Sequence, residues 1–210
     1  MTDVAVVDYG MGNLRSVEQA LHKVAPAAEI AVTDDADTIE SAKRVVFPGQ
    51  GAMPDCMREL DARGLRNAVL LAARSKPFLG ICIGLQMLFE HSDEGDIAGL
   101  GILHGKVVRF ASQMHDAQGN RLKVPHMGWN QVHHGQHPMW DGIEQDARFY
   151  FVHSYHVQPQ DTSLIQATSQ YPQSFVCAVG KDNLFAVQFH PEKSQAAGLK
   201  LLQNFMQWNP

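Results

Sequence analysis

A cysteine with a glycine two residues away on each side is the first feature that could do chemistry. In the run FLGICIGLQMLF at residues 78–89, Cys82 lies between Gly80 and Gly84. The spacing matches the G-x-S-x-G turn, in which a strand runs into a helix and lifts a nucleophile to the edge of a sheet. Glycine has no Cβ, so strand and helix can approach closely there. The run predicts a nucleophilic thiol; the alternative is a tight turn around a small buried cysteine.

We expect a helix to begin directly after Cys82, over LQMLFE at 85–90. The N-terminus of a helix carries a partial positive charge and would favour the thiolate. The backbone N–H of Ile83 would then be placed to donate to an oxyanion that forms beside the sulfur.

A nucleophilic cysteine needs a base, and one of the 11 histidines has a suitable context. His190 ends an apolar stretch in FAVQFHPEKS, and Pro191 biases it toward extended backbone. Residues i and i+2 of an extended chain face the same way, so Glu192 can orient the His190 ring. We therefore predict a triad of Cys82, His190 and Glu192. The alternative is a capped strand end followed by a helix.

A third segment, VVFPGQGAMPD, takes a predicted strand into a turn at residues 48–51. Gly49 and Gly51 tolerate φ of either sign and leave backbone N–H groups exposed, as an anion site requires. The backbone of Gln50 and Gly51 is therefore a candidate for the same oxyanion site as Ile83. Taken alone, a Pro-Gly turn is usually only a turn.

Four histidines lie close together in the sequence, at His126, His133, His134 and His137. Their spacing fits no pair of ligands on a helix, and no carboxylate pattern joins them. We expect neither a metal site nor a cofactor.

Composition narrows the class of protein. The chain has 210 residues, 45% of them hydrophobic and 19% charged, which suits a globular protein with a substantial core. A net charge of −5 without any basic run argues against nucleic acid as a partner. The N-terminus does not resemble a signal peptide, and no stretch approaches the ~20 apolar residues of a membrane span. Three widely spaced cysteines fit a reducing compartment, so we expect the cytoplasm.

The elements that must position these residues change character along the chain. In the first half, strands are expected at 4–8, 29–33, 44–48 and 77–81, and helices at 14–24 and 65–72. Such alternation predicts a mostly parallel sheet covered on both faces. After residue 95, strands are expected at 106–110, 149–157, 163–168, 174–179 and 184–189, with few helices between them, which indicates antiparallel pairing. We expect Cys177 to pack in the hydrophobic core and a final helix to form around residues 199–206. No linker appears, so we expect a single domain over 1–210.

The motifs GICIGLQ, PGQG and HPE together resemble those of the class I, triad-type glutamine amidotransferases. The resemblance covers almost the whole chain. Two further stretches, VVDYGMGNLRSV near the start and PHMGWN at 125–130, are similar to the glutaminase subunits of imidazole glycerol phosphate synthases. Glutaminases that serve other pathways share the cysteine turn but not this pair of stretches.

The resemblance implies a fold and a reaction. The fold would be α/β and flavodoxin-like, with a mostly parallel central sheet flanked by helices and antiparallel strands in the C-terminal half. The enzyme would hydrolyse L-glutamine through a glutamyl thioester on Cys82. The ammonia would pass to a separate (β/α)₈-barrel cyclase subunit, the partner in a heterodimer that serves histidine biosynthesis.

The resemblance also assigns contacts. Glutamine would be held by Gly51, Gln86, Ser154 and Tyr155, and the partner interface would include Asn13, Trp129 and Lys193. Gln86 follows Cys82 by one helical turn, so it can face the same pocket. Gln50 departs from the family pattern, which usually has valine there.

Two rival interpretations use the same residues. A stand-alone cysteine hydrolase of similar architecture would need neither PHMGWN nor a pocket shaped for glutamine. A non-catalytic scaffold would be expected to lack Cys82 or His190, and this chain has both.

Overall fold

Five parallel strands form the centre of the fold, which a computed structural model describes for residues 2–116 and 118–210. In the order β2-β1-β3-β4-β14, they are β2 (Ile30–Thr33), β1 (Val4–Val7), β3 (Arg44–Gly49), β4 (Phe78–Cys82) and β14 (Leu184–Val187). Every residue of β1, β4 and β14 is buried, because helices and loops cover both faces. The predicted parallel α/β sheet is confirmed.

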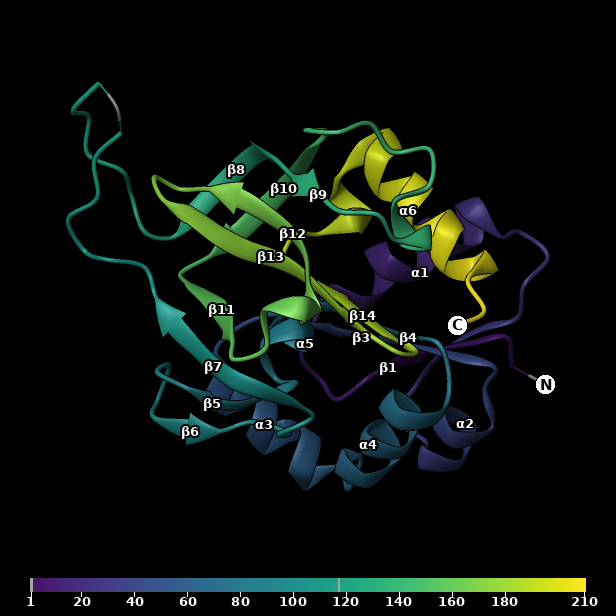
Figure 1. Cartoon of the computed structure of the whole chain (residues 1–210). Helices are drawn as coiled ribbons and strands as arrows, with labels where there is room; N and C mark the ends of the chain where they lie inside the picture. The colour runs from purple at the N-terminus through teal and green to yellow at the C-terminus, as the bar shows by residue number, and fades with distance from the viewer. Residues whose placement is uncertain (1, 117) are drawn as a thin grey trace.

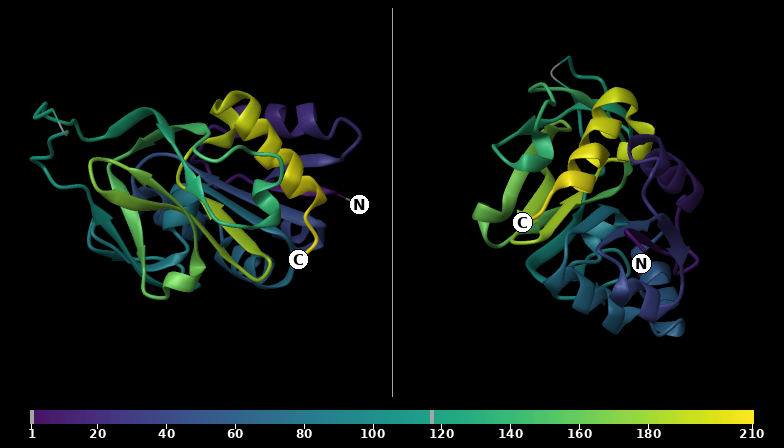
Figure 2. Two further views of the ribbon diagram at one scale, coloured as in Figure 1. Left: turned by 45° about the horizontal axis from the view of Figure 1, so that its top comes forward. Right: turned by 90° about the vertical axis from the view of Figure 1, so that its right-hand side faces the viewer.

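Helices lie on both sides of this sheet (Figure 1). On one side α1 (Leu14–Val24) contacts α6 (Gln195–Gln207), and the pair stays together in both views of Figure 2. On the other side are α2 (Ala36–Ser41), α3 (Met53–Ala62) and α4 (Arg66–Ser75). The sequence predicted α1, α4 and α6. It did not predict α3, whose buried face is made mainly of sulfur-containing residues, Met53, Cys56 and Met57, with Leu60.

Further strands continue the sheet beyond β14, and their neighbouring pairs are antiparallel, as expected for the second half, except for one parallel pair between Phe89–Ser92 and Leu103–Arg109. The order runs on through β13 (Ser174–Lys181), β11 (Tyr155–Pro159), β7 (Leu103–Arg109), β5 (Phe89–Ser92) and β6 (Ile97–Ala98). Two further strands, β12 (Ile165–Gln170) and β9 (His133–His134), pair beside β13. One expectation was wrong: β14 is parallel to β4 and antiparallel only to β13, so the sheet changes direction at this strand.

The segment FYFVHSYHV forms two strands where the sequence predicted one. β10 (Arg148–His153) pairs with β8 (His126–Gln131) in a separate two-stranded sheet. β11 begins at Tyr155 and belongs to the large sheet. The chain therefore changes sheets at Ser154, which lies between the end of β10 and the start of β11.

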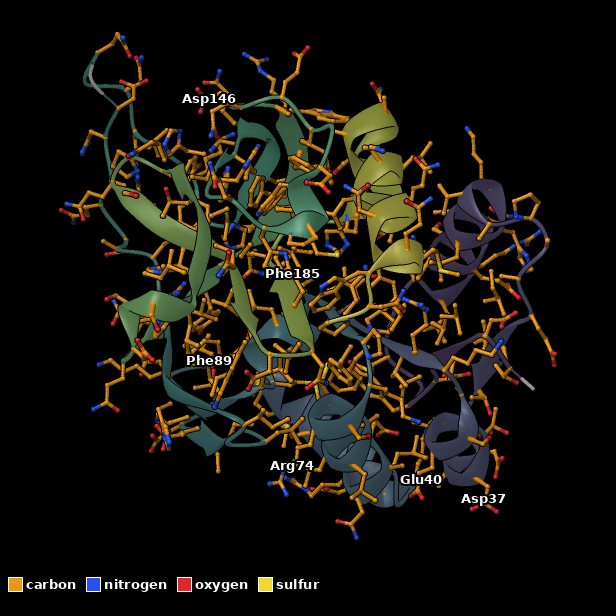
Figure 3. All side chains as sticks on the ribbon, turned by 45° about the vertical axis from the view of Figure 1, so that its right-hand side comes forward. Asp37, Glu40, Arg74, Phe89, Asp146 and Phe185 are labelled. Atoms are coloured by element: carbon orange, nitrogen blue, oxygen red, sulfur yellow. The ribbon has the colours of Figure 1, made fainter. Side chains whose placement is uncertain are left out.

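The distribution of side chains follows polarity (Figure 3). Phe89 and Phe185 are fully buried, whereas the charged Asp37, Glu40 and Arg74 lie on the outside. Cys177 is fully buried between Phe175 and Val179 along β13, as predicted for core filler. Within the described residues, no helix combines the length and the apolar character needed to cross a membrane.

Candidate active site

The backbone at Cys82 is strained. β4 ends at this residue, α5 (Ile83–Gln86) starts at the next, and Cys82 has φ of 57°, which is unusual for a residue with a side chain. The two glycines make the turn possible. A Cβ on Gly84 would overlap the carbonyl oxygen of Phe47, and one on Gly80 would lie 2.9 Å from the Cβ of Ala186. The strand-to-turn geometry is the one that the G-x-C-x-G spacing predicts.

The helix expected after Cys82 is only one turn long. α5 ends at Gln86, and Phe89 already belongs to strand β5, where it pairs with Leu103. The predicted helix over LQMLFE is therefore wrong beyond its first turn. Leu85, Met87 and Leu88 are all buried, so the segment has no polar face that would keep a helix on a surface. A single turn carries little dipole, and Cys82 needs another source of stabilising charge.

His190 supplies that charge. Its Nδ1 is 2.8 Å from Oε1 of Glu192, and the two side chains are 4% and 1% exposed. Burial alone would lower the pKa of His190, but the charge of a Cys82 thiolate and the hydrogen bond to Glu192 outweigh it and raise the pKa to about 10. The arrangement favours a protonated His190 ring beside Cys82.

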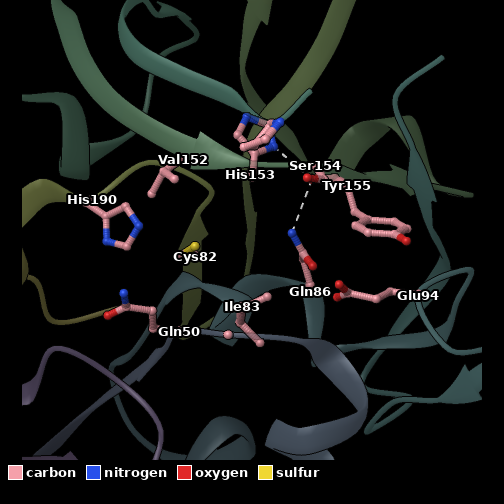
Figure 4. A pocket seen from close by; sticks show the side chains of 12 residues that line it. Gln50, Cys82, Ile83, Gln86, Glu94, Val152, His153, Ser154, Tyr155 and His190 are labelled. Carbon is pink, nitrogen blue, oxygen red and sulfur yellow. Dashed lines mark hydrogen bonds between the residues drawn. The ribbon is translucent and has the colours of Figure 1, made fainter. Parts of the chain in front are cut away.

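The other nitrogen of the His190 ring faces the pocket that contains Cys82 (Figure 4). Nε2 is buried and has no hydrogen-bond partner among the described residues. The backbone holds the ring in place, since the His190 N–H donates to the Tyr150 carbonyl and its own carbonyl accepts from the Ser194 hydroxyl. A nitrogen held without a partner beside a thiol can exchange a proton with whatever binds between them.

A cavity of about 300 Å³ opens beside Cys82, a size that suits a small metabolite. Every predicted catalytic, oxyanion and glutamine-binding residue except Glu192 lines it. Glu192 lies behind His190, as an orienting group should. Figure 4 shows His190 and Gln50 at one end of the cavity and Tyr155 and Glu94 at the other. Ser154 and Tyr155 reach it through the break between β10 and β11.

Sequence reasoning missed two residues of the site. Gln188 is fully buried, and its Nε2 lies 3.8 Å from Sγ of Cys82. Its Oε1 accepts from Nε2 of Gln86 at 3.0 Å. The signal was available: Gln188 precedes His190 by two residues in the strand predicted to end there, and alternate residues of a strand face the same way.

Glu94 is the second residue that sequence reasoning missed. It lines the cavity at the end away from His190, and its Oε2 accepts from the backbone N–H of Met53 at 2.9 Å. A carboxylate at that end can bind a cationic group of a ligand. In the sequence it is one acidic residue in a turn, SDEGD, with nothing to distinguish it from a solvated charge.

The peptide that follows Gln50 is held by a weak hydrogen bond. The carbonyl of Gln50 accepts from the thiol of Cys56 at 3.6 Å, and burial raises the pKa of that thiol to about 11, so it stays a donor. A trans peptide points its C=O and the next N–H in opposite directions, so the N–H of Gly51 points away from Cys56. Gly51 has φ of 111°, a conformation open to glycine.

The proposed interface residues lie on elements that touch one another. Asn13 directly precedes α1, and Lys193 ends the short helix η3 (Pro191–Lys193), which contacts both α1 and β10. Trp129 lies on β8, the partner of β10, and is 43% exposed. The three residues therefore lie on neighbouring elements.

The clustered histidines have separate environments. His126 is buried beside His153, His134 stacks on Trp140, and His137 caps the short helix that begins at Pro138. Within residues 2–116 and 118–210, no three potential ligands gather around a point where a metal could bind.

Comparisons with known proteins identify a family and similar chains. The family model described as glutamine amidotransferase class-I matches residues 5–208. The chain is 67% identical over 210 residues to the imidazole glycerol phosphate synthase subunit HisH of Thiobacillus denitrificans, covering 99% of this chain and 92% of the relative. It is 65% identical over 212 residues to the subunit of the same name from Nitrosospira multiformis, covering 100% of both.

Solved structures show the same fold at low sequence identity. A crystal structure titled as a glutamine amidotransferase superposes with a TM-score of 0.72 at 18% identity, covering 98% of this chain and 97% of that one. A putative GMP synthase subunit from Thermoplasma acidophilum gives a TM-score of 0.70 at 18% identity, covering 99% and 93%.

Proposed function

This chain belongs to the class I glutamine amidotransferases, and we propose that it uses Cys82, His190 and Glu192 to take ammonia from L-glutamine as the glutaminase subunit of an imidazole glycerol phosphate synthase. The observation that carries the assignment of residues is the Glu192–His190 hydrogen bond of 2.8 Å behind a cavity that holds a cysteine on a strained turn.

The first half of the reaction forms a thioester. The Cys82 thiolate attacks the side-chain carbonyl carbon of glutamine, and the oxygen becomes an oxyanion that backbone N–H groups of Ile83 and the Gln50–Gly51 segment stabilise. The tetrahedral intermediate collapses as the C–N bond breaks. His190 gives its Nε2 proton to the leaving nitrogen, which departs as ammonia.

The second half releases glutamate. His190 is now neutral at Nε2 and takes a proton from a water that attacks the thioester carbonyl. Collapse of the second intermediate breaks the C–S bond and returns the thiolate–imidazolium pair. Glu192 stays ionised and holds the ring in place throughout.

Recognition of glutamine falls to the far end of the cavity. Glu94 places a carboxylate where the α-ammonium of the substrate would lie. Oε1 of Gln86 is buried and has no partner within the described residues, so it can accept from the substrate. Ser154, Tyr155 and Gly51 would contact the remaining polar groups. A glutamine bound in this way would bring its amide to Cys82.

Ammonia needs an acceptor close at hand, because in neutral water it is mostly ammonium and no longer a nucleophile. The relatives' names describe a subunit, and the partner we propose is the (β/α)₈-barrel cyclase of histidine biosynthesis. Exposed Met127 and Trp129 on β8, with Asn13 and Lys193, offer it a surface. Three free cysteines suit the cytoplasm, and one sheet that spans both halves supports a single domain.

The test separates the release of ammonia from glutamine on this chain from the cyclisation on the partner subunit. In the complex with its cyclase, Cys82→Ala should abolish synthesis from glutamine and leave synthesis from high external ammonium intact, since the cyclisation takes place on the other subunit. Retained glutamine hydrolysis in a clean preparation would overturn the nucleophile. Hydrolysis that never depends on the cyclase would favour a stand-alone hydrolase.

A further inference from the structure

We propose that His126 and His153 form a hydrogen-bonded pair in which each ring donates from Nδ1. The pair holds residues of the glutamine pocket in place and connects the pocket to strand β8. The proposal rests on the glutamine-hydrolysing function above, because it assigns the pair a role in holding Tyr155 and Gln86. Both residues are positioning residues, since they act on the substrate through other groups.

The pair belongs to an unbroken series of hydrogen bonds. Nδ2 of Asn130 lies 3.2 Å from Nε2 of His126, and Nδ1 of His126 lies 3.0 Å from Nε2 of His153. Nδ1 of His153 then lies 2.7 Å from the carbonyl oxygen of Tyr155. His126 and His153 are directly opposite each other on the paired strands β8 and β10, and both are buried. The series crosses from one sheet to the other.

The chemistry of the end groups fixes the direction of every bond. The Tyr155 carbonyl can only accept, so Nδ1 of His153 donates to it. Burial lowers the pKa of His153 to about 3, so the ring is neutral at pH 7 and its Nε2 must accept. Nδ1 of His126 must therefore donate. Burial lowers the pKa of His126 to about 4, so its Nε2 in turn accepts from Asn130.

The amide of Asn130 agrees with this direction independently. Its Nδ2 also donates to the carbonyl of Gln170 at 2.8 Å, and its Oδ1 accepts from the backbone N–H of Gln131 at 2.9 Å. The nitrogen therefore faces His126, as the series requires. Both histidines have one permitted tautomer, with the proton on Nδ1.

At the pocket end, the series reaches a residue that would touch substrate. The Tyr155 carbonyl accepts from His153 and also from Nε2 of Gln86 at 3.2 Å, which uses both of its lone pairs. The same Gln86 nitrogen donates to Oε1 of Gln188. Figure 4 shows Gln86 reaching toward the Ser154–Tyr155 turn. A shift of that carbonyl would turn the Gln86 amide and move the oxygen available to glutamine.

At the other end, the series begins on a strand with an exposed outer face. His126, Gly128 and Asn130 alternate with Met127 and Trp129, which are 64% and 43% exposed. The His126 ring stacks on Tyr171 with ring centroids 4.0 Å apart and on Phe151 at 5.0 Å. A partner bound over Met127 and Trp129 would contact the strand that holds His126. A shift of this strand on binding would be passed to the Tyr155 carbonyl through the hydrogen bonds of the two histidine rings.

The first experiment reads the tautomers directly. Long-range ¹H–¹⁵N correlation spectra of the full chain at pH 7 should show both rings as the Nδ1–H form, with assignments from the loss of signals in His126→Phe and His153→Phe. Where a variant does not fold, contacts from the His126 ring to Tyr171 assign the wild-type spectrum. An Nε2–H tautomer or a charged ring at either position would overturn the proposal.

The second experiment measures the effect on glutamine. In the complex with the cyclase, His126→Phe keeps an aromatic ring between Tyr171 and Phe151 but ends the series. The KM for glutamine should rise about three- to tenfold, the effect of losing one hydrogen bond, with a smaller change in kcat. His134→Phe is the matched control, because His134 also stacks on an aromatic ring, Trp140, but lies outside the series.

The outcomes separate the two proposals. An unchanged KM in a folded His126→Phe complex would overturn the positioning role. A wild-type complex that hydrolyses no glutamine would instead defeat the proposed function, and the tautomers would still report on the hydrogen-bonded pair. Synthesis from ammonium should stay unchanged in both variants, and a loss there would count against a role confined to the glutamine pocket.

Discussion

The amide nitrogen of Gln188 lies 3.8 Å from the sulfur of Cys82, although the two residues are 106 positions apart in the sequence. The contact exists because β14 and β4 run parallel as neighbours, so the segments that follow them meet at one edge of the sheet. Gln188 also holds the Gln86 side chain through its oxygen. One side chain therefore touches both the predicted nucleophile and a predicted substrate contact.

Gln188→Leu removes the hydrogen bond from the Gln188 amide to the sulfur of Cys82. A hydrogen bond to a charged sulfur is stronger than one to a neutral group, so kcat/KM for glutamine should fall by about 10- to 100-fold. The measurement is steady-state hydrolysis by the complex. Gln158→Leu, an exposed position on β11, is the control and should change little. Equal activity in the two variants would mean that Gln188 only fills space.

Glu192→Gln should change the pH profile as well as the rate. In the wild type the pKa of His190 is raised to about 10, partly by the Glu192 hydrogen bond, so the ring stays protonated well above neutral pH. Removing the carboxylate charge lowers that pKa, and the proton needed by the leaving ammonia is lost at a lower pH. The alkaline limb of kcat/KM should move to lower pH, and the maximum should fall about 10²- to 10⁴-fold.

The surface offers a matched control for that experiment. Glu90 accepts from Nδ1 of His104 at 2.9 Å in an exposed pair of the same type. Glu90→Gln should leave both the rate and the alkaline limb in place. If Glu192→Gln lowered kcat/KM equally at every pH and left the alkaline limb in place, the result would contradict the electrostatic role assigned to Glu192.

Cys82 should be the thiol that a glutamine-mimicking electrophile such as diazo-oxo-norleucine labels first. Burial raises the pKa of Cys56 to about 11 and raises that of Cys177 further, so neither forms a thiolate readily at neutral pH. Neither has a histidine base beside it in the cavity. Peptide mapping after short exposure measures the distribution, and label found mainly on Cys56 would contradict the site.

Acid should destabilise the protein between pH 6.5 and about 4. There the unfolded chain protonates its histidines, while burial keeps the pKa of His126 near 4 and that of His153 near 3. The unfolded state binds more protons, so the free energy of unfolding falls as pH falls, by up to about 1.4 kcal/mol per pH unit for each ring. His190 opposes this slope only near pH 6.5, where its unfolded form is still gaining a proton that the folded ring already holds, and it adds none at lower pH, where it is protonated in both states.

Urea unfolding at several pH values measures that slope. His126→Phe and His153→Phe should each flatten it, whatever they do to stability at pH 7. His104→Phe, at an exposed site, should not. A slope that survives in both buried variants would place the acid sensitivity in other groups, such as His137 and His156, whose pKa values burial also lowers.

The hydrogen bond from Cys56 to the Gln50 carbonyl should restrain the oxyanion segment. Cys56→Ala removes the donor, so the Gln50–Gly51 peptide can turn more easily. The ratio between the glutaminase rate of the cyclase complex and that of the free chain should fall about three- to tenfold. Cys56→Ser keeps a donor and is the control. A β-branched substitution at Gly49 is not a suitable test of this peptide, because its Cβ would overlap the Tyr9 hydroxyl.

Local sequence determined the parts of the site that depend on near neighbours. The glycines around Cys82 permit the turn, and the two-residue spacing of His190 and Glu192 brings their side chains together, although Glu192 lies in the short helix η3 and not in the extended backbone that the sequence predicted. α1 followed from its 3.6-residue apolar period. Each of these features has a signature within a few residues, so the sequence alone indicated them.

Tertiary structure decided what depends on contacts between distant segments. Glu94 becomes a pocket residue because β5 brings it to Met53, and Ser154 enters the site because the chain changes sheets there. α5 stops after one turn because the apolar residues that follow are buried on every side. In each case the free energy comes from burial and hydrogen bonds to partners far away in the sequence, which no local pattern encodes.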